Sequence, residues 1–189
     1  MPTFLGLDLS LTGTAWALTP GSSAPYEYAL VKTSPKDYVD RWVRYEHIAG
    51  EVCKVIMQRQ PSFIVLEDYI CNPHNVMTTM ALIEMGAVVR ARIAVLGLPW
   101  MTVVGSQLKK YVTGSGVGHK SVIIKDVYKH FNVDVDDDNL ADAVVLATMA
   151  RDIHGYKFKS ILPTQKYRQE VLKKVLDSRE VFNGSRWIA

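Results

Sequence analysis

Three short apolar segments follow one another at the N-terminus, before the first helical pattern. Residues 3–9 and 13–18 predict two strands, and residues 26–33 alternate polar and apolar side chains like a third. From residue 37 onward, helical and strand patterns alternate. A meander followed by this alternation predicts a mixed sheet that is antiparallel at its start and parallel in its extension, with helices packed on its faces.

The later elements are expected at definite places along the chain. Helices are predicted at residues 37–60, 76–96, 107–112, 121–130 and 139–153, and strands at 62–68 and 100–105. Ser106 is the expected N-cap of the 107–112 helix, and a glycine-rich loop follows at residues 114–120. The tail predicts one more helix, with Pro163 in its first turn and Tyr167, Val171, Leu172 and Val175 on one face.

Composition limits the class of protein. Of the 189 residues, 48% are hydrophobic and 22% are charged, which suits one globular unit without a membrane span or a signal peptide. Two cysteines, Cys53 and Cys71, are too few for a disulfide framework or a zinc cluster, so reduced thiols are expected. Charge is uneven: residues 151–189 carry 9 basic and 4 acidic side chains. This basic tail indicates either a polyanion partner or a solvated terminal helix.

Three carboxylates stand where the predicted fold would bring them together. Asp8 lies between leucines in the first strand, Glu67 ends the strand at 62–68, and Asp142 interrupts an apolar helix face. If the first and fourth strands pair in parallel, these acids lie close together, and a divalent ion such as Mg²⁺ or Mn²⁺ would offset their repulsion. Each acid alone also fits another role: a turn residue, a strand-end charge, or a charge near a helix start.

Four segments, in order, resemble the RuvC-type Holliday-junction resolvases of the RNase H-like (retroviral integrase) superfamily. They are GLDLSLTGTAWAL, IVLEDYICNPHNVMTTMALIEMGAVVRA, VGSQLKKYVTGSGVGHKSVI and DDDNLADAVVLATMA. The resemblance implies an α/β fold of the RNase H-like type: a mixed five-stranded sheet, three strands antiparallel and the rest parallel, flanked by helices. It further implies a nuclease domain at residues 1–156 and a basic, helical C-terminal extension at 157–189. We expect a bacteriophage version that acts in the cytoplasm of a bacterial host cell.

The resemblance also assigns catalytic and metal-binding residues. Asp8, Glu67 and Asp142 match metal ligands of the family, which implies two Mg²⁺ ions in each active site, with Mn²⁺ as a substitute. The family usually has a further acid where this chain has Asn139, so either Asn139 or the neighbouring Asp138 completes the metal site. Lys120 matches a catalytic lysine close to the scissile phosphate, where a cation stabilises developing negative charge.

Further residues are expected to contact DNA. Lys109 and Lys110 would contact phosphates, although one of the two could simply be solvated. His119 could share the role of Lys120. Tyr69 lies where the family presents an aromatic side chain to bases at the junction centre, and it would either stack on a base or belong to the core.

A homodimer is expected because the helix at 76–96 matches the one through which the family pairs. Met77, Met80, Met85 and Val88 are the candidate interface residues, although a methionine-rich helix can equally be core. Arg90 and Arg92 would lie at the edge of that interface or touch DNA.

The sequence thus predicts a metal-dependent endonuclease that resolves four-way junctions by two-metal hydrolysis to 5′-phosphate and 3′-hydroxyl ends. Other branched DNA stays open as a further substrate. Two other hypotheses stay open. A sugar-kinase or actin-like ATPase shares the DLSLTGTAWAL hairpin but needs a second lobe. A catalytically inactive protein that binds branched DNA would explain Asn139.

Overall fold

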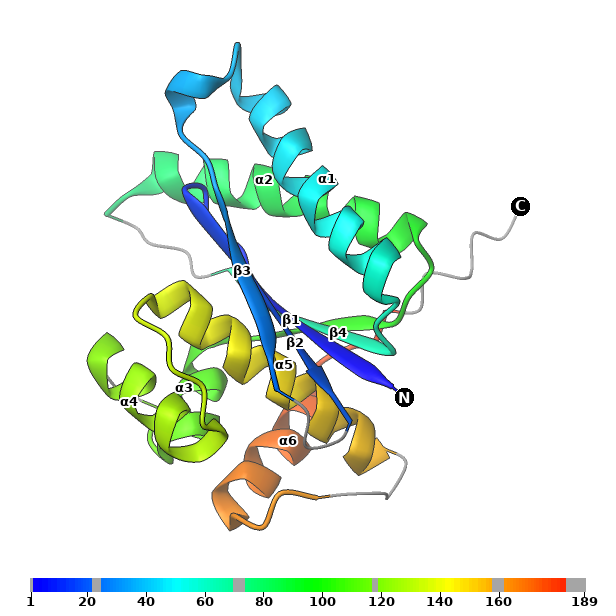
Figure 1. Cartoon of the computed structure of the whole chain (residues 1–189), viewed down its shortest axis with the longest axis vertical. Coiled ribbons are helices and arrows are strands. Elements are labelled where there is room, and N and C mark those ends of the chain that lie inside the picture. The colour runs from blue at the N-terminus through cyan, green and yellow to red at the C-terminus, as the bar shows by residue number, and fades with distance from the viewer. Residues whose placement is uncertain (1, 22–24, 70–73, 117–118, 158–161, 183–189) are drawn as a thin grey trace.

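A five-stranded mixed sheet forms the centre of the protein (Figure 1). The computed structural model describes residues 2–21, 25–69, 74–116, 119–157 and 162–182, without the side chains of Lys120 and Lys157. The strand order is β3-β2-β1-β4-β5. The strands are β1 (Thr3–Asp8), β2 (Gly13–Pro20), β3 (Glu27–Lys32), β4 (Phe63–Glu67) and β5 (Trp100–Val103). β1, β2 and β3 pair antiparallel, while β4 pairs in parallel with both β1 and β5, which confirms the expected sheet.

Helices cover both faces of this sheet. One face packs against α1 and α2, and the opposite face packs against α3 to α6 (Figure 1). Their bounds are α1 (Arg41–Arg59), α2 (Val76–Val95), α3 (Gly105–Thr113), α4 (Lys120–Phe131), α5 (Asp138–Lys157) and α6 (Lys166–Ser178). Each face therefore has its own hydrophobic core, and the sheet separates the two.

The alternation of side chains along β1 and β4 determines where the acids lie. Leu5 and Leu7 belong to the core under α1 and α2, while Phe4 belongs to the core under α5. Because side chains two residues apart share a face of a strand, Asp8 lies on the same side as Phe4. The same count places Glu67 on the side of Val65, which also packs under α5. Both acids therefore project toward α5.

Gly6 allows α5 to lie directly on the middle of the sheet. A Cβ atom at Gly6 would stand 2.2 Å from the carbonyl oxygen of Ala143 and 2.2 Å from the amide nitrogen of Ala147. These are backbone atoms of α5, so no side-chain movement could relieve the overlap. Only glycine permits this approach, which brings the first turns of α5 beside the end of β1.

Three helix starts differ from the sequence prediction. Residues 35–37 form a separate 3₁₀ turn, and α1 begins after Asp40, whose carboxylate accepts hydrogen bonds from the amides of Trp42 and Val43. Ser106 is not an N-cap, because α3 begins at Gly105 and the side chain of Gln107 accepts from the amide of Val104 at 3.3 Å. Pro163 precedes α6 instead of lying in its first turn; its carbonyl accepts from the Gln169 side chain.

The last described part of the chain returns to the sheet edge. Val171, Leu172 and Val175 of α6 are buried in the core on the α5 face, as the sequence predicted. Beyond α6, Phe182 forms an isolated antiparallel bridge with Trp100 of β5, and their rings stack with centroids 4.3 Å apart. The domain boundary expected at residue 156 stays a prediction.

The α2 helix is buried on one side and exposed on the other. Met77 and Met80 are 75% and 52% exposed, but Met85 is fully buried and Val88 packs against the core. The prediction that Met85 belongs to an interface was therefore wrong: its position on α2 faces the sheet.

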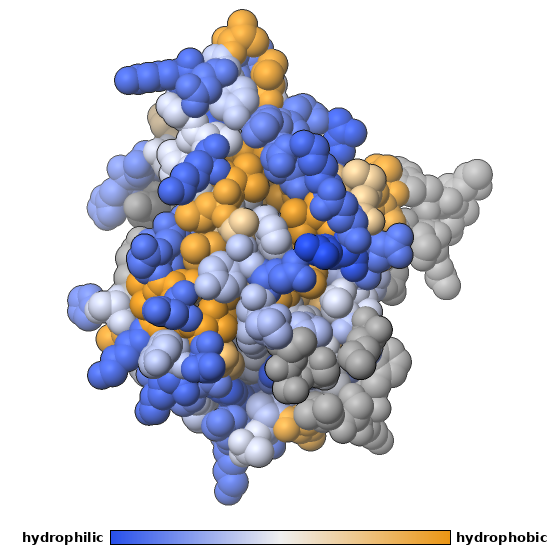
Figure 2. Space-filling view, viewed as in Figure 1, coloured by the Kyte–Doolittle hydropathy of each residue, from blue (hydrophilic) through white to orange (hydrophobic). Residues whose placement is uncertain are grey.

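On the face seen in Figure 2, apolar residues also gather between β3 and α1, bordered by hydrophilic ones. Among the described helices, none combines the length and apolarity that crossing a bilayer requires.

Candidate active site

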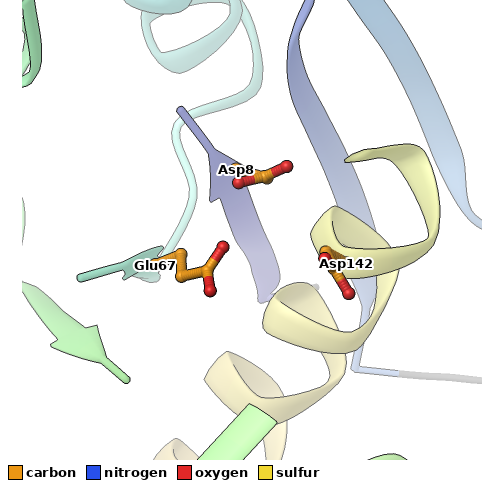
Figure 3. A group of neighbouring side chains, drawn as sticks. All are labelled: Asp8, Glu67 and Asp142. Atoms are coloured by element: carbon orange, nitrogen blue, oxygen red, sulfur yellow. The ribbon is translucent and has the colours of Figure 1, made fainter. Parts of the chain in front are cut away.

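Asp8, Glu67 and Asp142 converge at one end of the sheet (Figure 3). Asp8 ends β1, Glu67 ends the parallel neighbour β4, and Asp142 comes from the second turn of α5. One carboxylate oxygen from each lies within 4.8 Å of the other two. Asp8 is buried, while Glu67 and Asp142 are partly exposed, so the cluster is reachable from solvent on one side.

The three charges strongly disfavour one another. Burial raises the pKa of Asp8 well above its ordinary value, and the negative charges of Glu67 and Asp142 raise it further. Burial also raises the pKa of Glu67, although a hydrogen bond with Asp8 and the positive charge of Lys109 oppose that rise. The hydrogen bond between the two raises the pKa of Asp8 and lowers that of Glu67, so Asp8 is the donor in this pair.

The donor set fits a divalent metal ion. Three carboxylates whose oxygens lie this close together are the ligands that Mg²⁺ and Mn²⁺ prefer. A bound cation would replace the proton that the raised pKa of Asp8 retains and would remove the repulsion within the cluster. A small cavity of about 140 Å³ opens beside Asp8 and Glu67 and is also lined by Asp68, Tyr69 and Leu82.

Asp138 and Asn139 take different positions at the start of α5. The Asn139 side-chain nitrogen donates to the carbonyl oxygen of Gly13 at 3.1 Å and so ties α5 to the first residue of β2. Asp138 is close enough for its charge to contribute to the raised pKa of Asp8. Both residues therefore border the cluster, and the group of three close carboxylates comprises Asp8, Glu67 and Asp142 among the described residues.

The four basic residues predicted to contact DNA lie in two adjacent pairs, one on α3 and one at the start of α4. Lys109 on α3 acts electrostatically on Glu67, whereas Lys110 lies 3.8 Å from Glu170 of α6. His119 is exposed and occupies the N-cap position of α4. Lys120 is the first residue of α4, and its side chain lies outside the described part of the chain.

Tyr69 lies two residues after Glu67 and packs inward. Its hydroxyl rests against Gly86 of α2, where an added Cβ would stand 2.1 Å away, and that hydroxyl has no hydrogen-bond partner among the described residues. The guanidinium of Arg90 covers the ring at 3.9 Å from its centroid. Of the two roles predicted for Tyr69, this conformation corresponds to packing, and stacking on a base would require the ring to move.

A cluster around Asp68 escaped the sequence analysis. Its carboxylate pairs with Arg179 at 2.6 Å and with Arg90 at 3.4 Å, and its amide donates to Val103 of β5. Arg90 and Arg92 were expected at the interface edge or on DNA. Arg90 instead pairs with Asp68, and Arg92 pairs with Glu46 of α1 at 2.6 Å. Arg179 is 111 residues from Asp68, so no local pattern indicates the pair.

Known proteins resemble this chain in sequence and in fold. No protein-family model matches the chain. It is 30% identical over 149 residues to the crossover junction endodeoxyribonuclease RuvC of Rickettsia prowazekii, a match that covers 76% of this chain and 92% of that protein.

The chain belongs to the RuvC family.

The RuvC of Rickettsia bellii is 27% identical over 148 residues, with the same shares of both chains covered. Among solved structures, Thermus thermophilus RuvC in complex with a Holliday junction substrate matches with a TM-score of 0.68 at 17% identity, covering 86% of this chain and 99% of that one. A second Thermus thermophilus RuvC structure gives 0.65 at 18% identity. These two matches confirm the RNase H-like fold of this RuvC-family chain. Its bacteriophage origin stays a prediction.

Proposed function

We propose that this RuvC-family protein is a metal-dependent, structure-selective endonuclease that cuts four-way DNA junctions. The convergence of Asp8, Glu67 and Asp142 from three distant segments carries the proposal. The RuvC relatives are crossover junction endodeoxyribonucleases, and one structural neighbour binds a Holliday junction substrate. Because its substrate would be DNA, we further propose that it acts in the cytoplasm of a bacterial host cell.

The three carboxylates would hold two Mg²⁺ ions, with Mn²⁺ as a substitute. When bound, such ions supply activation of a water molecule and stabilisation of the leaving 3′-oxygen, which leaves a 5′-phosphate. Asp8, the buried member of the cluster, would lose its proton on loading and hold the ions together with Glu67 and Asp142. Lys109, which already acts on Glu67, would attract the scissile phosphate toward the carboxylates, and Lys120 would stabilise its developing charge.

Asp138 is our choice for the ligand that completes the metal set. Its negative charge already acts on Asp8, whereas Asn139 uses its side-chain nitrogen to hold Gly13. Asp138→Asn is expected to weaken divalent-ion binding, while Asn139→Asp is expected to strengthen it by adding a carboxylate. Titration of both variants with Mn²⁺, followed by electron paramagnetic resonance, separates these two residues.

A homodimer would supply the two active sites that symmetrical incision requires. The exposed apolar side of α2 supports this assembly, since Met77, Met80 and Ile83 are all exposed there. Lys110, His119 and Tyr69 stay candidate DNA contacts, and the extension at residues 157–189 stays a candidate addition to the DNA surface.

The test compares a labelled four-way junction with linear duplex of the same sequence, in Mg²⁺. The parent is expected to cut the junction symmetrically into 5′-phosphate and 3′-hydroxyl products, and Asp8→Asn is expected to bind without cutting. Asp177→Asn, which neutralises an exposed acid on α6, is the matched control and should cut like the parent. Junction binding without cutting by the parent, whatever divalent ion is present, would support an inactive DNA-binding protein instead.

The actin-like ATPase hypothesis is not favoured. The resemblance to those enzymes rests on the hairpin of β1 and β2, whereas the match to a RuvC relative spans 149 residues and 76% of this chain. ATP hydrolysis measured beside the junction assay should stay at the level of buffer alone.

A further inference from the structure

A second pocket lies on the α5 face, at the end of the sheet opposite the acidic cluster. Its cavity volume is about 560 Å³, within the range of small-ligand sites. Thr19, at the far end of β2 from the cluster, lines it, as do residues from β3, the end of α4, α5 and α6. The side chains that matter here are Tyr26, Tyr28, His130, Phe131, Arg151 and Arg168.

Arg168 is a buried cation that lacks an opposite charge among the described residues. It is only 6% exposed, and its Nε donates to the carbonyl oxygen of Tyr111 at 3.1 Å. Its Nη2 is buried and has no hydrogen-bond partner in the described part of the chain. A buried charge left in this state costs several kcal/mol.

Aromatic rings offset only part of this cost. The Arg168 guanidinium carbon lies 5.0 Å from the ring centroid of Phe131 and 5.1 Å from that of Tyr111. Such contacts stabilise a cation by about 0.5–2 kcal/mol each, but they neither neutralise its charge nor accept a directed hydrogen bond. The nearby carboxylate of Asp152 is already taken by the hydroxyl of Tyr111 and by Nε of Arg151.

Two further basic groups line the same pocket. Arg151 has about a third of its side chain exposed, and it contacts Asp152 through Nε at 2.8 Å. His130 has its pKa lowered by burial and then by the positive charge of Arg168. Asp134 also lines the pocket, so one acid stands against two arginines. The pocket therefore favours a small anion.

The pocket also holds aromatic side chains that are fixed by their neighbours. The Tyr26 and Phe131 rings are 6.4 Å apart, the Tyr26 hydroxyl is 2.8 Å from the Thr148 hydroxyl, and the Tyr28 hydroxyl donates to the Asp134 carbonyl at 3.1 Å. Flat rings held in place beside cations are suited to a planar base attached to a phosphate.

We propose that this pocket binds a nucleotide, with Arg151 and Arg168 on its phosphate and Tyr26 and Phe131 against its base. The ligand is either a free nucleoside monophosphate or the 5′-phosphorylated end nucleotide of a DNA strand. The site is separate from the acidic cluster and does not depend on the proposed nuclease activity.

Binding is tested on the full chain in EDTA, so that no divalent ion can hold a phosphate at the acidic cluster. Deoxyadenosine monophosphate, inorganic phosphate and a short single strand with or without a 5′-phosphate are titrated by calorimetry. Arg151→Gln and Arg168→Gln are expected to weaken binding of the nucleotide at least about tenfold, the loss typical of one charge-assisted contact. Lys54→Gln, on an exposed position of α1 on the other face of the sheet, is the matched control and should bind like the parent.

The outcomes separate clearly. A preference for the 5′-phosphorylated strand over the 5′-hydroxyl strand and the free nucleotide identifies a DNA end as the ligand, and tighter binding of the free nucleotide identifies the monophosphate. Because Arg168 is buried, urea unfolding first shows whether Arg168→Gln is as stable as the parent. If it is not, Arg151→Gln alone tests the proposal. Absence of saturable binding to the parent, equal affinity for inorganic phosphate and nucleotide, or an undiminished affinity in Arg151→Gln would overturn the proposal.

Discussion

Helices α2 and α5 have the same length, but α5 is enclosed by its neighbours and α2 is not. Each has 20 residues and carries apolar side chains around most of its circumference. α5 lies between the sheet and the other helices of its face, and from Ala143 to Ala147 every residue is fully buried. α2 buries one side against the sheet and α1 and exposes the other. A helix that is apolar on all sides is thus either buried on all sides or exposes an apolar surface that can bind a partner.

The largest expected effect concerns the contact that encloses α5. Gly6→Ala places a methyl group 2.2 Å from two backbone atoms of α5, so the free energy of unfolding should fall by about 3 kcal/mol or more. Gly50→Ala on α1 is the control, since a Cβ there meets no atom within 4 Å. That variant should be unchanged or up to about 1 kcal/mol more stable. Urea unfolding of both measures the difference, and equal stabilities would show that α5 does not rest on Gly6.

The next effect separates the chemistry of α5 from its packing. Asp142→Asn removes one carboxylate of the cluster but keeps the shape of the side chain. Junction cleavage should fall more than about a hundredfold, since even residues that only support metal ligands cost 10–100-fold. The metal-free protein should unfold at the same or a higher urea concentration, because repulsion in the cluster decreases. A normal cleavage rate in this variant would remove α5 from the active site.

A smaller effect is expected on the exposed side of α2. Met80→Glu introduces a charge at a position that is 52% exposed, so the monomer should lose less than about 0.5 kcal/mol of stability. If α2 pairs with a second copy, the dimer dissociation constant should rise at least about tenfold. Analytical ultracentrifugation measures this constant. Met85→Ala is the contrasting change, because Met85 is fully buried and its loss should cost about 2–5 kcal/mol in folding.

The smallest effect is a dependence of stability on pH that arises at the acidic cluster, on the α5 side of the sheet. The pKa of Asp8 is raised in the folded protein by burial and by Glu67 and Asp142, so the folded state holds a proton that the unfolded state releases. Stability of the metal-free parent relative to Asp8→Asn should therefore fall as pH rises from the ordinary carboxyl range through the raised pKa. Urea unfolding in EDTA at a series of pH values measures this difference in stability. With Mg²⁺ in place of EDTA, the direction of this pH dependence should reverse. A difference independent of pH would contradict a protonated Asp8.

Much of this arrangement could be predicted from the sequence because it follows local rules. The sequence predicted that Asp8 and Glu67 lie close together if the first and fourth strands pair in parallel, and β1 and β4 do pair in this way. Exposure on α2 could not be predicted, because methionine spacing does not reveal which side meets the sheet. The start of α3 was placed two residues late, since a glutamine side chain replaces the expected serine cap.

Long-range ionic contacts were the other gap. The ion pair of Asp68 with Arg179 forms only because the segment after α6 docks near β4. The burial of Arg168 likewise depends on where α6 docks, and both are set by tertiary packing. The charge imbalance of residues 151–189 indicated either an anionic partner or a solvated terminal helix, but not which arginine would be buried.

The most direct measurement of the central claim is the anomalous scattering of Mn²⁺ in crystals soaked with that ion. The account predicts manganese peaks within coordinating distance of carboxylate oxygens from Asp8, Glu67 and Asp142, and their loss in Asp8→Asn crystals treated in the same way. Manganese bound elsewhere on the protein, with none between these three side chains, would contradict it.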